Sequence, residues 1–198
     1  STAELVEVAR PAGARGGYYF SHIRSEEERL LEAISEAIHI GRETGAPVQI
    51  SHLKAAGRAN WHLADQALAL IDQAREEGLD VSADMYPYPA GNTVLSVLLP
   101  DWAHEGGKAA TLARLKDPET RPRIIAELAP WAEWDAIQVS EAPRQRHYEG
   151  RTIAELATSA AKSPENWLCD ALVETGLDAS IILFSMSEEN LARQIRHP

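Results

Sequence analysis

The sequence predicts an α/β fold, because short strand-like segments alternate regularly with longer helix-like ones. Three apolar or aromatic segments, residues 16–22, 48–52 and 79–84, have the composition and length of strands. They recur about every 30 residues with an amphipathic segment between each pair, which is the pattern of βαβ units in a parallel sheet. The pattern leaves open whether this sheet is doubly wound or part of a closed barrel.

Capping signals and apolar periodicity define the helix expected after the first strand. Ser25 and Glu28 have the spacing of a capping box, which predicts that the helix begins there and that Glu26 lies on its polar side. The apolar residues at helical spacing are Leu31, Ile34 and Ile38. Gly45 and Pro47 then end the helix. A second helix is expected from an N-cap at Asn60.

The composition of the chain changes between residues 87 and 143. Most of its prolines and three of its five tryptophans, Trp102, Trp131 and Trp134, fall in this range. Prolines at this density prevent long elements, and a segment of this length between regular units is typical of an insertion or lid. We therefore divide the chain into a strand–helix unit, an inserted, mostly helical, lid-like subdomain and a return to the first unit, at residues 1–87, 88–150 and 151–198. Short helices are expected at 112–116, 123–128, 152–161 and 167–174, a strand at 180–186, and a final helix after Ser187.

Composition excludes several classes of function. With 30 acidic and 19 basic side chains in 198 residues, the net charge of −11 argues against a nucleic acid or an anionic membrane as partner. The single cysteine, Cys169, excludes a disulfide scaffold, and no apolar run or signal-peptide pattern indicates a membrane span or secretion. We therefore expect a cytoplasmic protein. The length is below the roughly 250 residues of a complete (β/α)₈ barrel.

Both ends of the chain look cut. The first residues read as a helix already under way, and the last residues read as a helix stopped by Pro198. We expect an internal piece of a longer protein, and the alternative is a processed small domain.

Two strand-end histidines are the most informative residues of the sequence. His22 and His52 each end a predicted strand and are each followed, two positions later, by a cation, Arg24 or Lys54. Ligand sites in α/β folds lie at the carboxyl ends of the strands, and neighbouring parallel strands are about 4.8 Å apart, so both imidazoles can reach one metal ion. The alternative is that each histidine is a hydrogen-bonded residue at a strand end. Asp84 ends the third strand and could point inward or outward.

Other catalytic patterns are weak or missing. The sequence has no dinucleotide-binding glycine motif, no complete P-loop and no nucleophile elbow. Cys169 lies in an apolar helical segment, which is typical of a buried structural thiol. The remaining histidines, expected at the surface, are His39, His62, His104, His147 and His197.

Three motifs carry a resemblance to a known family. They are YYFSHIRSE at 18–26, PVQISHLKAAG at 47–57 and DMYPYPAGNT at 84–93, supported by YEGRT at 148–152 and FSMSEE at 184–189. Together they resemble the N-acyl-D-amino-acid deacylases, or D-aminoacylases, of the amidohydrolase superfamily. The resemblance implies a partial (β/α)₈ barrel, about strands 5–7 with their helices, and an insertion that covers the active site.

The resemblance also implies the chemistry. The family hydrolyses N-acyl-D-amino acids to a D-amino acid and a carboxylate with zinc, as one or two divalent ions. His22 and His52 match metal ligands, and Lys54 and Tyr86 match residues that hold the substrate carboxylate and carbonyl. Asn92 stands where the family has a substrate-binding serine, and Arg24 is a further candidate. The family's first-strand His-x-His, its ligand cysteine and its catalytic aspartate, expected beyond Pro198, have no counterpart here.

Two alternatives remain open. One is another amidohydrolase that acts on cyclic amides, as dihydroorotases and hydantoinases do. The other is a non-catalytic α/β piece whose histidines bind nothing. On the deacylase interpretation we expect the chain by itself to be inactive towards N-acyl-D-amino acids. If the chain folds alone, we expect it to self-associate through unpaired strand edges.

Overall fold

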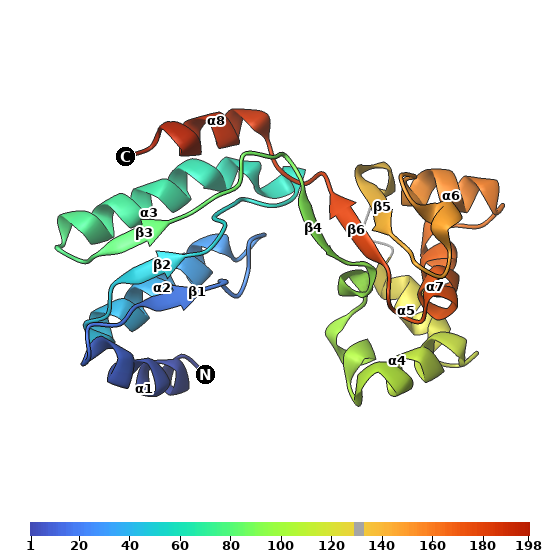
Figure 1. Cartoon of the computed structure of the whole chain (residues 1–198), viewed down its shortest axis with the longest axis horizontal. Coiled ribbons are helices and arrows are strands. Elements are labelled where there is room, and N and C mark those ends of the chain that lie inside the picture. The colour runs from blue at the N-terminus through green and yellow to red at the C-terminus, as the bar shows by residue number, and fades with distance from the viewer. Residues whose placement is uncertain (129–132) are drawn as a thin grey trace. The chain divides into compact units, whose positions relative to one another are not determined.

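Two separate sheets organise the chain, and each belongs to its own unit of the fold (Figure 1). The computed structural model describes residues 1–128 and 133–198, so Trp131 lies outside the described residues. Unit 1 comprises Ser1–Pro89 and Ser185–Pro198, and unit 2 comprises Ala90–Phe184.

Unit 1 consists of strands that alternate with helices. Its elements are α1 (Thr2–Gly13), β1 (Tyr19–Ser21), α2 (Leu30–Thr44), β2 (Val48–Ile50), the 3₁₀ helix η1 (Arg58–Leu63), α3 (Ala64–Glu76), β3 (Val81–Ala83) and α8 (Glu188–Arg196). The strands pair in parallel in the order β1–β2–β3, which confirms the α/β class predicted from the sequence.

The register of this sheet separates a buried face from an open one. Val48, Ile50 and Val81 pack with the apolar sides of α2 and α3 in one core. The alternate positions Phe20 and Gln49 are partners in the ladder and point to the other face, where Phe20 is 66% exposed. This alternation follows from the period of two along a strand. The helices therefore cover one face of the sheet.

Two predicted helix starts are wrong. Helix α2 begins at Leu30 rather than near Ser25, whose hydroxyl accepts only the backbone N–H of Glu27 at 3.3 Å. The intervening residues form a loop because Glu26 turns towards the ends of the strands, as described below. Asn60 does not cap α3 either, since its amide donates to the Ala56 carbonyl and η1 precedes the helix.

The predicted end of α2 is confirmed. Gly45 is left-handed at φ 67° and its N–H donates to the Gly41 carbonyl, after which the chain turns into β2. Gly41 packs tightly against β2. A Cβ there would lie 2.3 Å from Cγ2 of Val48, so only glycine fits.

Unit 2 is a smaller unit of helices packed with an antiparallel sheet, β4–β6–β5. Its strands and α-helices are β4 (Gly91–Val94), α4 (Gly107–Lys116), α5 (Arg121–Leu128), β5 (Ile137–Glu141), α6 (Ile153–Ser159), α7 (Pro164–Thr175) and β6 (Ser180–Leu183). Four short 3₁₀ helices complete its described part: η2 (Leu95–Leu98), η3 (Asp101–His104), η4 (Trp134–Ala136) and η5 (Arg146–Tyr148).

The boundary of unit 2 differs from the expected one at residue 150. Leu156 of α6 and Leu168 and Leu172 of α7 are buried in the same core as Leu95 and Val139. These helices therefore belong to unit 2, and only Ser185–Pro198 return to unit 1. The sequence analysis did not predict β4 and β5, which are only four and five residues long and lie within the proline-rich stretch.

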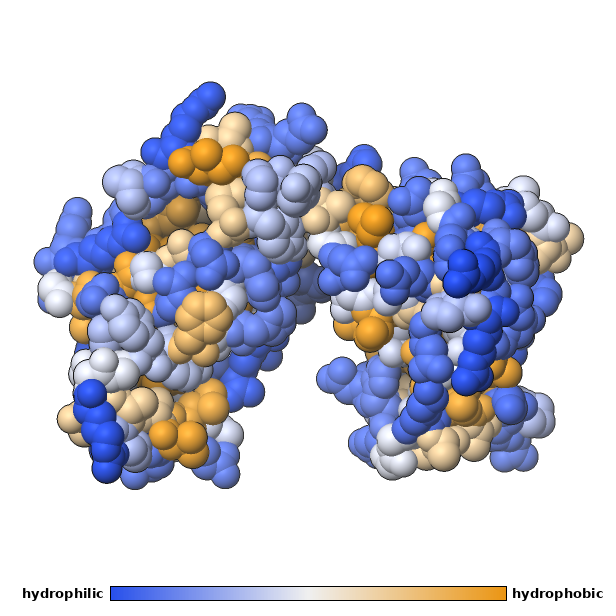
Figure 2. Space-filling view, viewed as in Figure 1, coloured by the Kyte–Doolittle hydropathy of each residue, from blue (hydrophilic) through white to orange (hydrophobic). Residues whose placement is uncertain are grey.

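The visible surface is mostly hydrophilic, with small separate apolar patches (Figure 2). No helix within the described ranges is both long and apolar enough to cross a bilayer.

Candidate metal centre

The side chains of His22 and His52 meet beyond the carboxyl ends of β1 and β2. His22 directly follows Ser21, the last residue of β1, and Ser21 pairs with Ile50 at the end of β2. His52 therefore lies one position further along its strand than His22. Its Nε2 is nevertheless 2.7 Å from Nδ1 of His22, and the ring planes are inclined by 72°.

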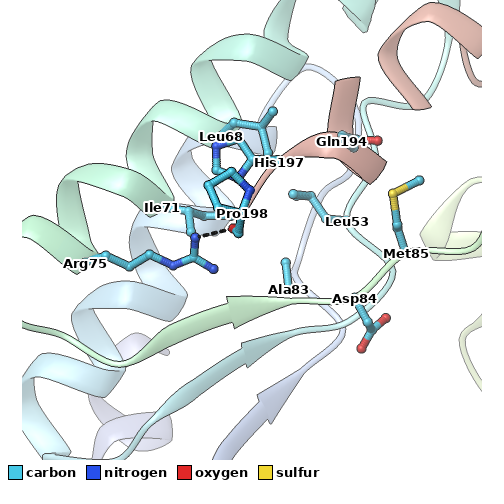
Figure 3. Close-up of a pocket in the computed structure, with 10 residues that line it drawn as sticks. All are labelled: Leu53, Leu68, Ile71, Arg75, Ala83, Asp84, Met85, Gln194, His197 and Pro198. Atoms are coloured by element: carbon cyan, nitrogen blue, oxygen red, sulfur yellow. Dashed lines mark hydrogen bonds between the residues drawn. The ribbon is translucent and has the colours of Figure 1, made fainter. Parts of the chain in front are cut away.

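An unusual backbone conformation brings His52 to this position. Its φ is 41°, in the left-handed region, which costs an ordinary residue roughly 1–2 kcal/mol. Asp84 supports the turn, because its Oδ1 accepts the backbone N–H of His52 at 2.6 Å. Its Oδ2 accepts from the Gln49 amide at 2.9 Å. Asp84 thus holds the backbone of a candidate ligand, and its side chain points away from the neighbouring pocket (Figure 3).

That pocket lies between β3, α3 and α8, and the histidine pair does not line it. Leu53, Ile71 and Met85 supply much of its apolar wall, and the guanidinium of Arg75 crosses it to donate to the Pro198 carbonyl (Figure 3). A second pocket, between α1, α2 and β1, does include His22.

Glu26 completes the group, and sequence reasoning missed it. Its Oε1 lies 2.8 Å from Nδ1 of His52 and 2.5 Å from Nζ of Lys54. Among the described residues, His22, Glu26 and His52 can converge on one ion, with ligand atoms within 4.8 Å of one another. The sequence signal that could have revealed Glu26 is its place four residues after a strand-end histidine.

Lys54 is the partly buried cation of this group, with a side chain 12% exposed. Burial lowers the pKa of its ammonium, while the Glu26 carboxylate acts in the opposite direction. Its Nζ lies 5.5 Å from the centre of the Tyr86 ring. Burial, aided by the negative charge of Glu26, raises the pKa of the Tyr86 hydroxyl, so its proton is held more firmly than that of an ordinary tyrosine.

The other two candidates lie in different surroundings. Arg24 donates through Nε to Glu36 at 2.6 Å, so its charge already has a partner. Asn92 belongs to unit 2, on β4, and its amide donates to the hydroxyl of Ser140 at 3.0 Å. The structure therefore groups His22, His52, Lys54 and Tyr86 within unit 1.

Several curated proteins are similar to this chain in sequence. The chain is 38% identical to an N-acyl-D-glutamate deacylase of Alcaligenes xylosoxydans xylosoxydans over 142 residues, which is 72% of this chain and 28% of that protein. It is 45% identical to a D-aminoacylase of the same organism over 95 residues, 48% of this chain and 19% of the relative. The chain is homologous to the N-acyl-D-amino-acid deacylases. No protein-family model matches it.

Solved structures of these deacylases share the fold. The N-acyl-D-glutamate deacylase of Bordetella bronchiseptica, complexed with zinc and a phosphonate inhibitor, matches all of this chain with 28% identity and a TM-score of 0.74. A D-aminoacylase matches 98% of the chain with 30% identity and a TM-score of 0.68. A further D-aminoacylase structure concerns a binuclear metal centre. The chain spans about a third of these structures, 34% and 33% of the first two.

Proposed function

We propose that this chain supplies two histidine ligands, His22 and His52, to the metal centre of an N-acyl-D-amino-acid deacylase. The reaction is hydrolysis of the amide bond to a D-amino acid and a carboxylate. The observation that carries the proposal is the 2.7 Å approach of two imidazole nitrogens at the ends of neighbouring parallel strands, in a chain homologous to these deacylases.

The donor set fits zinc. Imidazole nitrogens are typical zinc ligands, and two nitrogens on a tetrahedral zinc ion are about 3.3 Å apart. The rings of His22 and His52 would thus have to separate by only about half an ångström. Zinc bound there supplies a Lewis acid and a water of lowered pKa.

Neighbouring residues would orient the substrate. Lys54 offers its buried ammonium to the substrate carboxylate, and Tyr86 keeps a hydroxyl proton that can stabilise an oxyanion by hydrogen bonding. Arg24 remains a proposed substrate contact in a lesser role, since it is already paired with Glu36. We assign the parallel sheet of unit 1 to about strands 5–7 of a (β/α)₈ barrel, and unit 2 to a lid.

Zinc binding to the purified chain tests the ligands. We expect the wild-type chain to bind zinc, and His22→Ala or His52→Ala to weaken binding at least tenfold, because each removes one of few ligands. Equilibrium dialysis with metal analysis measures this. His39→Ala, which removes an exposed histidine of α2, is the matched control and should bind like the wild type. Unchanged binding in both site variants would support the non-catalytic alternative instead.

A further inference from the structure

We propose that Glu26 is a positioning residue for His52: its carboxylate accepts the Nδ1–H of the imidazole and leaves Nε2 as the metal-binding lone pair. This inference rests on the proposed function, which takes His52 as a ligand. Carboxylates that orient a ligand histidine in this way fix both its tautomer and its ring.

The distances around the imidazole support this role. Oε1 of Glu26 lies 2.8 Å from Nδ1 of His52, whereas Nε2, at the other side of the ring, faces His22 at 2.7 Å. The two ring nitrogens point in different directions. While Oε1 of Glu26 accepts from Nδ1 of His52, Glu26 affects the metal ion only through the imidazole ring. To bind the ion directly, that oxygen would have to give up its hydrogen bond with Nδ1.

The donors and acceptors around Nδ1 of His52 favour one tautomer. Nδ1 of His52 has two polar neighbours, Glu26 at 2.8 Å and Nζ of Lys54 at 2.9 Å. A carboxylate can only accept, and an ammonium can only donate. Lys54 has other acceptors, Oε1 of Glu26 at 2.5 Å and the His52 carbonyl at 3.0 Å. A proton on Nδ1 thus satisfies Glu26, and Nε2 accepts from Nδ1–H of His22.

Glu26 is held in place from two sides. Its carbonyl accepts the backbone N–H of Ala56 at 2.7 Å, which ties the loop before α2 to the loop after β2. Its side chain is only 17% exposed and pairs with the partly buried Lys54. This anchoring explains why the loop interrupts the capping pattern at Ser25. Lys54 donates to Glu26 and to the His52 carbonyl, so one of its three ammonium protons is left for a substrate carboxylate.

Imidazole ¹⁵N spectra of the metal-free chain at mildly alkaline pH test the tautomer. We expect His52 to be mainly Nδ1–H in the wild type and in Glu28→Ala, the control, which removes an exposed carboxylate from the same loop. Glu26→Ala should convert His52 to a mixture or to Nε2–H. Glu26→Gln keeps an acceptor oxygen and should retain most of the Nδ1–H form. An unchanged His52 tautomer in folded Glu26→Ala would overturn the proposal.

Zinc affinity of the same variants provides a second readout. Glu26→Ala should weaken binding about 10–100-fold, Glu26→Gln less, and Glu28→Ala not at all. Weaker binding with an unchanged tautomer would make Glu26 a direct ligand and contradict the positioning role. If the wild type binds no more zinc than the His22→Ala/His52→Ala double variant, the proposed metal site fails, while the metal-free spectra still decide on Glu26.

Folding of the variants needs its own control, because Glu26→Ala leaves the Lys54 ammonium buried without its carboxylate. The double variant Glu26→Leu/Lys54→Met removes both charges and keeps the volume. It should fold, as circular dichroism can show, and should lose the Nδ1–H preference of His52. Retention of that preference in the double variant would also overturn the proposal.

Discussion

His52 combines an unusual backbone conformation with several polar contacts. It has a left-handed backbone, it donates its backbone N–H to Asp84, and its ring lies between His22 and Glu26. Histidine is one of the few residues other than glycine that adopt this backbone region with some frequency. The strain is located where two strand ends must present their side chains to the same point, which is common at functional sites.

Cys169 illustrates the opposite case, a reactive residue type in a structural setting. Burial in α7 raises the pKa of its thiol to about 11, although the charge of Arg121 acts in the opposite direction. The folded protein therefore favours the neutral thiol. The resulting stability is complete below the usual thiol pKa of about 8.5 and is lost as the pH rises towards the folded value.

We predict that Cys169 of the native chain reacts with a disulfide reagent far more slowly than the thiol of the unfolded chain. With a pKa about three units above a mildly alkaline assay pH, only about a thousandth of the thiol is thiolate. The native rate should rise about tenfold per pH unit. Stopped-flow absorbance with and without denaturant measures both rates, and equal rates would contradict the buried assignment.

At the scale of elements, unit 1 depends on close contact between helices and sheet. The sequence predicted where α2 ends, because a left-handed glycine followed by proline stops a helix for local reasons. It did not predict where α2 begins. The apparent capping box at Ser25 does not form, because the same segment places Glu26 beside His52 and Lys54.

Gly41→Ala should destabilise the chain despite the better helix propensity of alanine. The new methyl would lie 2.3 Å from Cγ2 of buried Val48, and such overpacking costs about 1–3 kcal/mol, against a gain of about 1 kcal/mol in propensity. Thermal or urea unfolding measures the change. Ser35→Ala, at an exposed position of α2, is the control and should stay within about 0.5 kcal/mol. An unchanged or higher stability of Gly41→Ala would refute the close contact.

At the scale of the whole molecule, the sheet of unit 1 is open. Among the described residues, β1 and β3 each pair with a single strand, β2. Tyr18 and Phe20 are 64% and 66% exposed at the β1 side. Unpaired strand edges with exposed aromatic residues promote pairing with another chain.

We therefore expect concentration-dependent self-association of the purified chain. Light scattering coupled to size-exclusion chromatography should show an increasing mass, and Phe20→Lys should shift the population towards monomer, because a charge beside the edge opposes pairing. Val8→Lys, on the exposed side of α1, tests whether any added charge has this effect and should leave the association unchanged. A monomeric wild type at every concentration would contradict the expectation.

Features that depend on local physics could be predicted from the amino-acid sequence alone. Alternation and spacing predicted the parallel strands of unit 1, and glycine, proline and Ser187 marked several helix boundaries, since capping and backbone restriction act within a few residues. The strand-end positions of His22 and His52 follow from the same patterns. The motifs also carried the likeness to the deacylases.

Which side chains meet became evident in the folded structure. The contact of Glu26 with His52, the support of the His52 backbone by Asp84, and the burial of α6 and α7 within unit 2 all join residues that are distant in sequence or masked by a competing local signal. Such contacts depend on the net free energy of burying side chains and pairing polar groups from distant parts of the chain. A capping pattern or a proline-rich stretch carries no information about those distant partners.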